Sequence, residues 1–202
     1  GGGWPVPARA LDVRMDGGPA RVATAHVFQT TGDLQDVRAI ADAAHAAGAL
    51  CLIDGYQTCG CVPLDVEAMG CDAFVGGCLK WLSGGPGNAF IYVRPGLIPR
   101  MRPQGTGWFA TRDPFSFTLQ ELTFADDARR METGTWAMPS HYAGLAALEL
   151  ILEIGVENIQ ERLRDLPDRI LGRCEEAGVK TSTHRDRNPR CGTRALDCDN
   201  PE

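Results

Sequence analysis

The sequence lacks the features that place a protein in a membrane or on a nucleic acid. No apolar run approaches the roughly 20 residues that a membrane-spanning helix needs. The first residues, GGGWPVPARALDV, have neither the basic start nor the long apolar stretch of a secretory signal. The net charge of −6 leaves no basic excess for phosphate backbones or anionic lipid surfaces. We therefore expect no membrane partner and no nucleic-acid partner.

Metal-binding spacing is also missing, although the chain has eight cysteines. There is no C-x-x-C pair, and Cys59-x-Cys61 has no second pair to complete a zinc site. A chain of 202 residues is long enough to build a core without a disulfide framework. We expect no metal site, and reduced, core-packing cysteines in a cytoplasmic protein. The eight are Cys51, Cys59, Cys61, Cys71, Cys78, Cys174, Cys191 and Cys198.

The first half of the chain alternates between strand and helix patterns. Short apolar runs predict strands at 21–29, 50–54, 72–76 and 88–93. Helical periodicity predicts a helix that is capped by Asp33 and runs to about residue 47, and a short helix at 65–69. This order of elements indicates an α/β layer with a mainly parallel sheet.

The second half of the chain has a different sequence pattern. Residues 94–138 are irregular and rich in Pro, Gly and aromatics, which is typical of a functional loop. Helices are predicted at 139–154 and 156–177, with a kink or break at Pro167. We expect a domain boundary near residue 155, which gives one domain over 1–155 and the start of a second over 156–202. The chain lacks an initial Met and stops after a strand-like GTRALDCD, so we expect it to be a piece of a longer protein.

Two residues at strand ends could carry chemistry. Asp54 follows the strand at 50–54, and Lys80 follows the strand at 72–76. In an open α/β sheet, ligands bind at the carboxyl ends of the strands. Taken alone, Asp54 is better explained as a helix cap or a turn residue. Lys80 in its apolar setting is explained equally by a nucleophilic amine or by a side chain that reaches water.

Together, the two residues suggest one cofactor. Pyridoxal 5′-phosphate (PLP) needs a lysine that forms a Schiff base with its aldehyde and an acid at its ring nitrogen. Adjacent strand ends could present Lys80 and Asp54 to opposite sides of one ring. The turn Gly84–Gly87 is read as a tight turn that fixes the loop behind Lys80. It lacks the G-x-x-x-x-G-K-[ST] pattern of a nucleotide-binding loop.

The stretch 52–93 resembles the cofactor core of class V aminotransferases, which are fold-type I PLP enzymes that include kynureninases and cysteine desulfurases. Asp54-Gly55-Tyr56-Gln57 resembles the family's D-x-x-Q or D-x-x-H element, and Lys80 follows Asp54 by 26 residues, as in desulfurases. LKWLSGGPGNAFIYV is similar to the kynureninase-type lysine loop. The resemblance implies a three-layer α/β fold of the PLP-dependent transferase type, incomplete at its N-terminal side, and the start of a small α+β domain.

The resemblance extends to further site residues. HVFQTTG is similar to a family strand end in which Gln29 lies near the cofactor's ring hydroxyl. TGW and RMETGT are similar to elements that place Trp108 and Thr135 at the phosphate, often across a dimer interface. The resemblance also implies that Gln57, like Gln29, lies near the cofactor ring. Each has a simpler explanation: a core aromatic for Trp108, a helix start for Thr135, and turn hydrogen bonds for Gln57.

The resemblance implies a homodimeric, PLP-dependent enzyme that acts on an amino acid through a Schiff base at Lys80. Its reaction stays open among kynureninase-like cleavage, cysteine desulfurase or selenocysteine lyase-like cleavage, and transamination. Leu79 stands where kynureninases carry Tyr and desulfurases carry His, and Gly77 stands where desulfurases carry a phosphate-binding Ser. A second hypothesis is a catalytically inactive fragment or pseudoenzyme that retains the α/β sheet.

Overall fold

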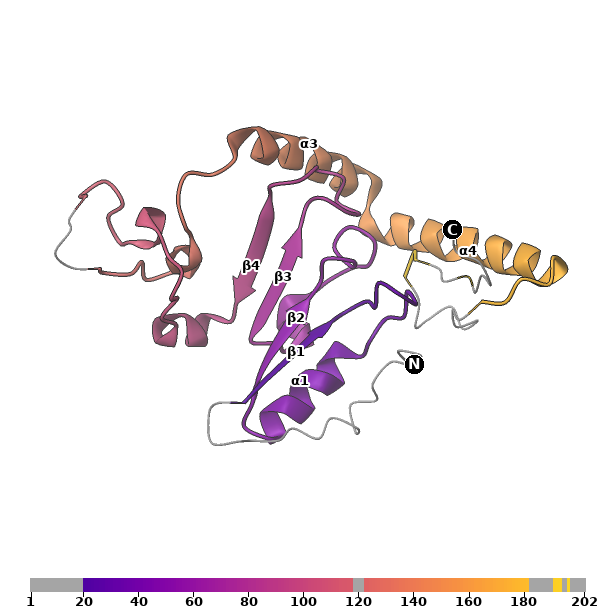
Figure 1. Ribbon diagram of the computed structural model, residues 1–202, viewed down its shortest axis with the longest axis horizontal. Helices are drawn as coiled ribbons and strands as arrows, with labels where there is room; N and C mark the ends of the chain where they lie inside the picture. The colour runs from indigo at the N-terminus through magenta and orange to yellow at the C-terminus, as the bar shows by residue number, and fades with distance from the viewer. Residues whose placement is uncertain (1–19, 118–121, 182–190, 194–195, 197–202) are drawn as a thin grey trace.

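The computed structural model describes residues 20–117, 122–181, 191–193 and 196. Four strands form one sheet in the order β1-β2-β3-β4 (Figure 1), and they span Arg21–Ala25, Leu50–Asp54, Ala73–Gly77 and Ala89–Val93. The first three strands run parallel, and β4 runs antiparallel to β3. The mainly parallel α/β sheet confirms the fold class that the sequence predicts.

The first helix begins later than the sequence predicts. α1 spans Val37–Ala46, and its N-cap is Asp36, whose side chain accepts a hydrogen bond from the Ala39 N–H at 3.0 Å. The predicted cap, Asp33, is wrong. The chain first folds back on itself after β1, and the Phe28 N–H donates to the Asp33 carbonyl at 3.0 Å. This backward pairing also ends β1 at Ala25, four residues before the predicted end.

The core lies between α1 and the sheet (Figure 1). Its α1 side chains follow helical spacing, and they meet buried side chains of β2 and β3. These residues are Val37, Ile40, Ala41, Ala44, Cys51, Ile53 and Phe74. The seven described cysteines are buried, as predicted, and Cys198 lies outside the described residues. Sulfur therefore serves as apolar packing in this core.

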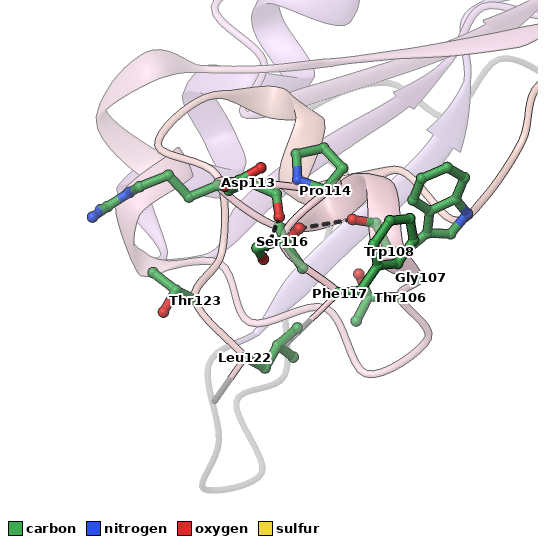
Figure 2. Close-up of a pocket in the computed structure, with 11 residues that line it drawn as sticks. Thr106, Gly107, Trp108, Asp113, Pro114, Ser116, Phe117, Leu122 and Thr123 are labelled. Carbon is green, nitrogen blue, oxygen red and sulfur yellow. Dashed lines mark hydrogen bonds between the residues drawn. The ribbon is translucent and has the colours of Figure 1, made fainter. Parts of the chain in front are cut away.

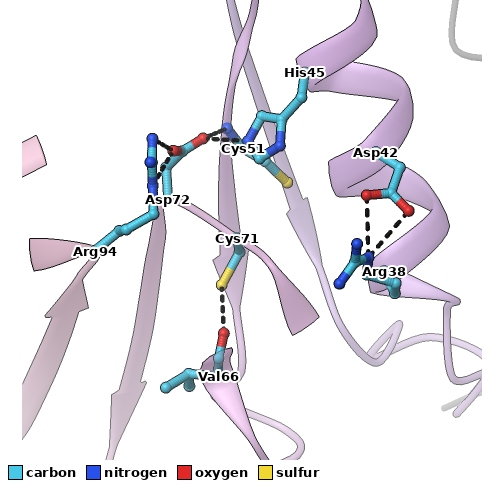
Figure 3. Close-up of polar contacts among 8 residues, drawn as sticks. All are labelled: Arg38, Asp42, His45, Cys51, Val66, Cys71, Asp72 and Arg94. Atoms are coloured by element: carbon cyan, nitrogen blue, oxygen red, sulfur yellow. Dashed lines mark hydrogen bonds and ion pairs between the residues drawn. The ribbon is translucent and has the colours of Figure 1, made fainter. Parts of the chain in front are cut away.

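A buried carboxylate ties four elements together at the amino ends of the parallel strands. Asp72 accepts hydrogen bonds from the Cys51 N–H at 2.8 Å and from Arg94 at 2.6 and 3.0 Å, and it lies 2.8 Å from His45 Nε2 (Figure 3). Burial alone raises the pKa of the Asp72 carboxyl. The bonds to Cys51, His45 and Arg94 outweigh this effect and hold the pKa below its usual value. This cluster is structural, because it lies at the edge of the sheet opposite Asp54.

The segment from β4 to the next helix is irregular, as predicted. It contains three short 3₁₀ helices, η2 (Pro95–Arg100), η3 (Trp108–Ala110) and η4 (Ala128–Met131), and it projects beyond β4 (Figure 1). The buried guanidinium of Arg130 donates to the Ala125 carbonyl at 2.6 and 2.9 Å and to the Ile98 carbonyl at 2.6 Å. The Arg130 side chain thus satisfies two carbonyl groups of this segment that lie outside helices and strands or at their ends.

Three further helices complete the described fold. α2 is Val66–Met69, α3 is Met138–Ile154 and α4 is Val156–Glu176. α4 is continuous through Pro167, whose side chain is buried, so the predicted break does not occur there. Gly155 separates α3 from α4, but whether a domain boundary lies there stays a prediction. Part of the predicted second domain lies outside the described residues. In the described ranges, no helix is both long and apolar enough to cross a membrane.

Candidate functional site

Asp54 lies at the carboxyl end of β2, in the centre of the parallel part of the sheet. Its backbone pairs in register with Ala25 of β1 and Val75 of β3. The side chain is exposed, and its Oδ1 accepts a hydrogen bond from the Tyr56 N–H at 2.8 Å. This local bond fixes the carboxylate and leaves it available to a ligand at the strand ends.

Lys80 lies in the loop that joins β3 to β4, which we call the lysine loop (Cys78–Asn88). The side chain of Lys80 is exposed, and its amine has no hydrogen-bond partner in the part of the chain that the structure describes. The loop itself is closed by backbone bonds from Cys78 N–H to the Asn88 carbonyl at 2.9 Å and from Gly84 N–H to the Cys78 carbonyl at 2.7 Å. A free amine is therefore carried on a well-connected loop.

The glycines of the lysine loop are required by its geometry. Gly85 and Gly87 have positive φ values of 73° and 88°, which side chains on L-residues disfavour. A Cβ on Gly84 would lie 2.8 Å from the Cα of Gly144 in α3. The loop therefore packs directly against the helix backbone, and the predicted tight turn behind Lys80 is confirmed.

A hollow of about 900 Å³ opens beside Asp54. Its lining includes Thr135 from the segment before α3, and Gly87 and Asn88 from the lysine loop. Tyr56, Trp136 and His141 also line it. The structure thus brings Asp54 and Thr135 together, as a shared cofactor site requires. Lys80, Gln57 and Gln29 are not among the residues that line this hollow.

Trp108 stands next to the segment that carries Thr135. Gly107 packs against Thr133 so closely that a Cβ on the glycine would lie 1.7 Å from the Thr133 carbonyl oxygen. A Cβ on Gly134 would lie 3.5 Å from the indole nitrogen of Trp108. Trp108 also lines a second hollow of about 610 Å³, shown in Figure 2, whose other walls include Phe117 and Leu122. The two sequence-predicted phosphate residues therefore lie in neighbouring segments.

A row of stacked rings was not expected from the sequence. Trp108 stacks on Phe109 at 4.2 Å between ring centres, Phe109 on Trp136 at 5.4 Å, and Trp136 on His141 at 5.8 Å. The row joins the loop of Trp108 to the start of α3 and holds Trp108 in place. The density of aromatic residues between 108 and 136 was its only signal in the sequence.

The two glutamines have different surroundings. Gln29 is exposed in the turn after β1. Gln57 is half-buried, and its Oε1 accepts a hydrogen bond from the indole N–H of Trp81 at 3.2 Å. The sequence suggested neither this bond nor any role for Trp81. Whether Gln29 and Gln57 contact a cofactor stays a prediction.

The polar groups of the predicted site residues match the three parts of PLP. An exposed carboxylate at Asp54 suits a protonated ring nitrogen. The exposed hydroxyl of Thr135 and the indole N–H of Trp108 suit phosphate oxygens. The amine of Lys80 suits an aldehyde. The residues that are present therefore fit the cofactor in chemical type.

Comparisons with known proteins agree with this chemistry. The family model for aminotransferase class-V matches residues 9–196. The uncharacterized aminotransferase YcbU of Bacillus subtilis is 34% identical over 161 residues, which cover 80% of this chain and 42% of that protein. The kynureninase of Deinococcus radiodurans is 32% identical over 151 residues, which cover 74% of this chain and 37% of that protein. The chain thus spans less than half the length of these curated relatives.

The solved structures show the same fold. The cysteine desulfurase of Thermococcus onnurineus superimposes with a TM-score of 0.80 at 21% identity. The match covers 89% of this chain and 44% of that one. At this identity the likeness establishes the fold and no finer property.

Proposed function

This chain belongs to the aminotransferase class-V family, and we propose that it is part of an enzyme that uses PLP to act on an amino acid. PLP is the cofactor of this family. The observation that carries the proposal is the hollow that Asp54 and Thr135 share with two residues of the lysine loop. It gathers the carboxylate, a hydroxyl and the loop of the free amine at one edge of the sheet.

In this proposal, Asp54 holds the ring nitrogen and Thr135 and Trp108 hold the phosphate. The Asp54 carboxylate is already oriented by the Tyr56 N–H, so little ordering is lost when it accepts a second hydrogen bond. Trp108 is held by stacking on Phe109, which keeps its indole N–H beside Gly134. Gln29 and Gln57 are assigned to the surroundings of the ring.

Lys80 is the reactive group of the proposal. Its Nζ would hold the cofactor through the aldehyde and, once the substrate amine has taken its place, would take and return the proton of the substrate α-carbon. When bound, PLP withdraws electrons from that carbon. The chain contains only two lysines, Lys80 and Lys180, and Lys80 follows β3, the strand that pairs with β2 and Asp54.

The reaction that we propose first is cleavage of the substrate side chain, of the kynureninase or desulfurase kind. The names of the kynureninase and cysteine desulfurase relatives support side-chain cleavage. The name of the aminotransferase relative supports transamination as the alternative reaction. An amino acid with a leaving group on its side chain is the corresponding substrate class.

We also propose that the whole enzyme is a homodimer. The family resemblance implies a dimer, and α3 leaves a surface open to a second copy or to the rest of the protein, because only Gly144 of its 17 residues is buried. A helix that is apolar on all sides is normally covered by protein. Its exposed apolar residues are Met138, Tyr142, Leu145, Leu148, Leu150, Leu152 and Ile154. Light scattering on the whole enzyme tests the dimer, and a monomeric mass contradicts it.

A spectral titration tests the proposed function. PLP is added to the chain and to the variants Lys80→Ala and Lys180→Ala, and the visible absorption band of a lysine-bound cofactor is followed. We expect saturation in the wild type and in Lys180→Ala, and no band in Lys80→Ala. Addition of L-cysteine, L-kynurenine or L-alanine should then shift the band, because the substrate amine displaces Nζ. A band that no amino acid shifts supports an inactive pseudoenzyme, and a band that survives in Lys80→Ala contradicts the proposal.

A further inference from the structure

Trp81, the residue after Lys80, contacts two other segments of the chain. Its indole N–H donates to Gln57 Oε1 at 3.2 Å. The six-membered ring packs on Gly192, where a Cβ would lie 2.6 Å from the ring. The next residue, Leu82, is buried in the core. Two successive residues after Lys80 are thus fixed on different parts of the molecule.

Gln57 joins this contact to a third segment. The backbone carbonyl oxygen of Gln57 lies 3.2 Å from the Sγ of Cys61 and 3.6 Å from the Sγ of Cys191. Cys191 in turn donates its N–H to the Gly32 carbonyl at 2.8 Å. The turn after β2, the lysine loop and the C-terminal segment at 191–192 therefore meet around Trp81.

The orientation of the Gln57 amide follows from this bond. An indole N–H can only donate, so it is the oxygen of the amide that faces Trp81. The side chain is then held by a residue that neighbours Lys80, and only the NH₂ group of the amide is left to donate to another group. A half-buried hydrogen bond of this kind restrains the loop that carries the amine.

We propose that Gln57 is a positioning residue: it holds Trp81, and through Trp81 it holds the backbone that carries Lys80. This inference deepens the proposed function and rests on it for the role of Lys80. It differs from a direct contact between Gln57 and the ring. If Gln57 acts only through Trp81, replacing Gln57 has no further effect in a variant that already lacks the Trp81 indole. If Gln57 touches the cofactor, its removal matters in both backgrounds.

Hydrogen exchange in the cofactor-free chain tests the positioning. The reporters are the amides of Ser83 and Gly84, which bond to the carbonyls of Lys80 and Cys78. We expect Gln57→Leu and Trp81→Phe each to speed their exchange about fivefold, which is what one net hydrogen bond supports. The double variant should exchange no faster than either single one. Gln57→Glu keeps an acceptor oxygen and should stay at the wild-type rate, as should Gln104→Leu, an exposed control.

The same variants are then labelled with PLP and borohydride. The rate of labelling at Lys80 should fall about fivefold in Gln57→Leu and in Trp81→Phe, with no further fall in the double variant. Unchanged exchange in Gln57→Leu, or effects that add in the double variant, overturns the inference. If exchange responds as expected but Lys80 is not labelled even in the wild type, the proposed function fails and the restraint on the loop stands. Trp81→Phe removes the indole donor and also shortens the ring that contacts Gly192, so thermal melting of this variant is measured to separate a local change from loss of the fold.

Discussion

Asp54 and Thr135 line the same hollow, although one ends β2 and the other precedes α3. The sheet brings Asp54 to this edge, and the irregular segment after β4 returns to it with Thr135. Such a meeting of distant segments is what a cofactor with a ring and a phosphate requires. It makes the role of Asp54 testable apart from that of Lys80.

Asp54→Asn should weaken PLP binding by at least about tenfold. An amide cannot hold the ring nitrogen in its protonated form, and a charged hydrogen bond of this kind contributes about 1.5–3 kcal/mol. Equilibrium dialysis of PLP against the wild type and the variant measures the change. Asp42→Asn, which breaks only an exposed pair with Arg38, is the matched control and should bind normally. Equal affinity for Asp54→Asn and the wild type would remove Asp54 from the site.

Asp72→Asn should lower the free energy of unfolding by about 3 kcal/mol without changing PLP binding. The carboxylate is buried and bonded to Cys51, Arg94 and His45. An amide keeps one acceptor oxygen and no charge, so its NH₂ group must face either Arg94 or the Cys51 N–H. Because the pKa of Asp72 is lowered in the fold, its stabilisation is present above the usual carboxyl pKa. It is lost as the pH falls through the lowered value. Urea unfolding at pH 7 gives the difference, and a change below 1 kcal/mol contradicts this account.

Stability should also fall between pH 6.5 and about 4 because of His26. Burial lowers the pKa of His26 from 6.5 to about 4, so the unfolded chain takes up a proton at higher pH than the folded chain does. The full stabilisation is present above pH 6.5, and as much as about 3 kcal/mol is lost by pH 4. Unfolding free energies of the wild type and His26→Gln across this range measure the effect. The variant should show the shallower slope, and parallel curves would show that His26 does not titrate this way.

The core cysteines should resist alkylation. Burial raises the pKa of Cys51 and of Cys59 to about 11, two units above the usual thiol value of 9.0. Since the thiolate is the reacting form, labelling at pH 8 should be about 100-fold slower in the folded chain than in urea. Mass spectrometry after iodoacetamide treatment reads each site. Rapid labelling of Cys51 in the folded chain would show that this core opens.

Local sequence patterns predicted much of the fold but not its longer-range contacts. The strand at 50–54 and the turn at Gly84–Gly87 were predictable, because apolar runs and glycines report local backbone preference. The choice between Asp33 and Asp36 as helix cap was not, because it depends on how residues 26–35 fold back on β1. The bond between Gln57 and Trp81 was beyond a local pattern for the same reason.

In the candidate site too, local patterns predicted some residues and could not predict others. Residue type and position at strand ends were enough to single out Asp54 and Lys80, since parallel strands bring their carboxyl ends together. The prediction that Trp108 binds the phosphate came only from the family resemblance. The aromatic row that holds it depends on contacts between a loop and the start of α3, which no spacing rule describes.

The most direct measurement of the central claim is the site of covalent attachment. The chain is incubated with PLP, reduced with borohydride and digested, and the modified peptide is identified by mass spectrometry. With only two lysines in the sequence, the result is unambiguous. We predict one label, on Lys80. A label on Lys180, an even division between the two lysines, or no label on either contradicts the account.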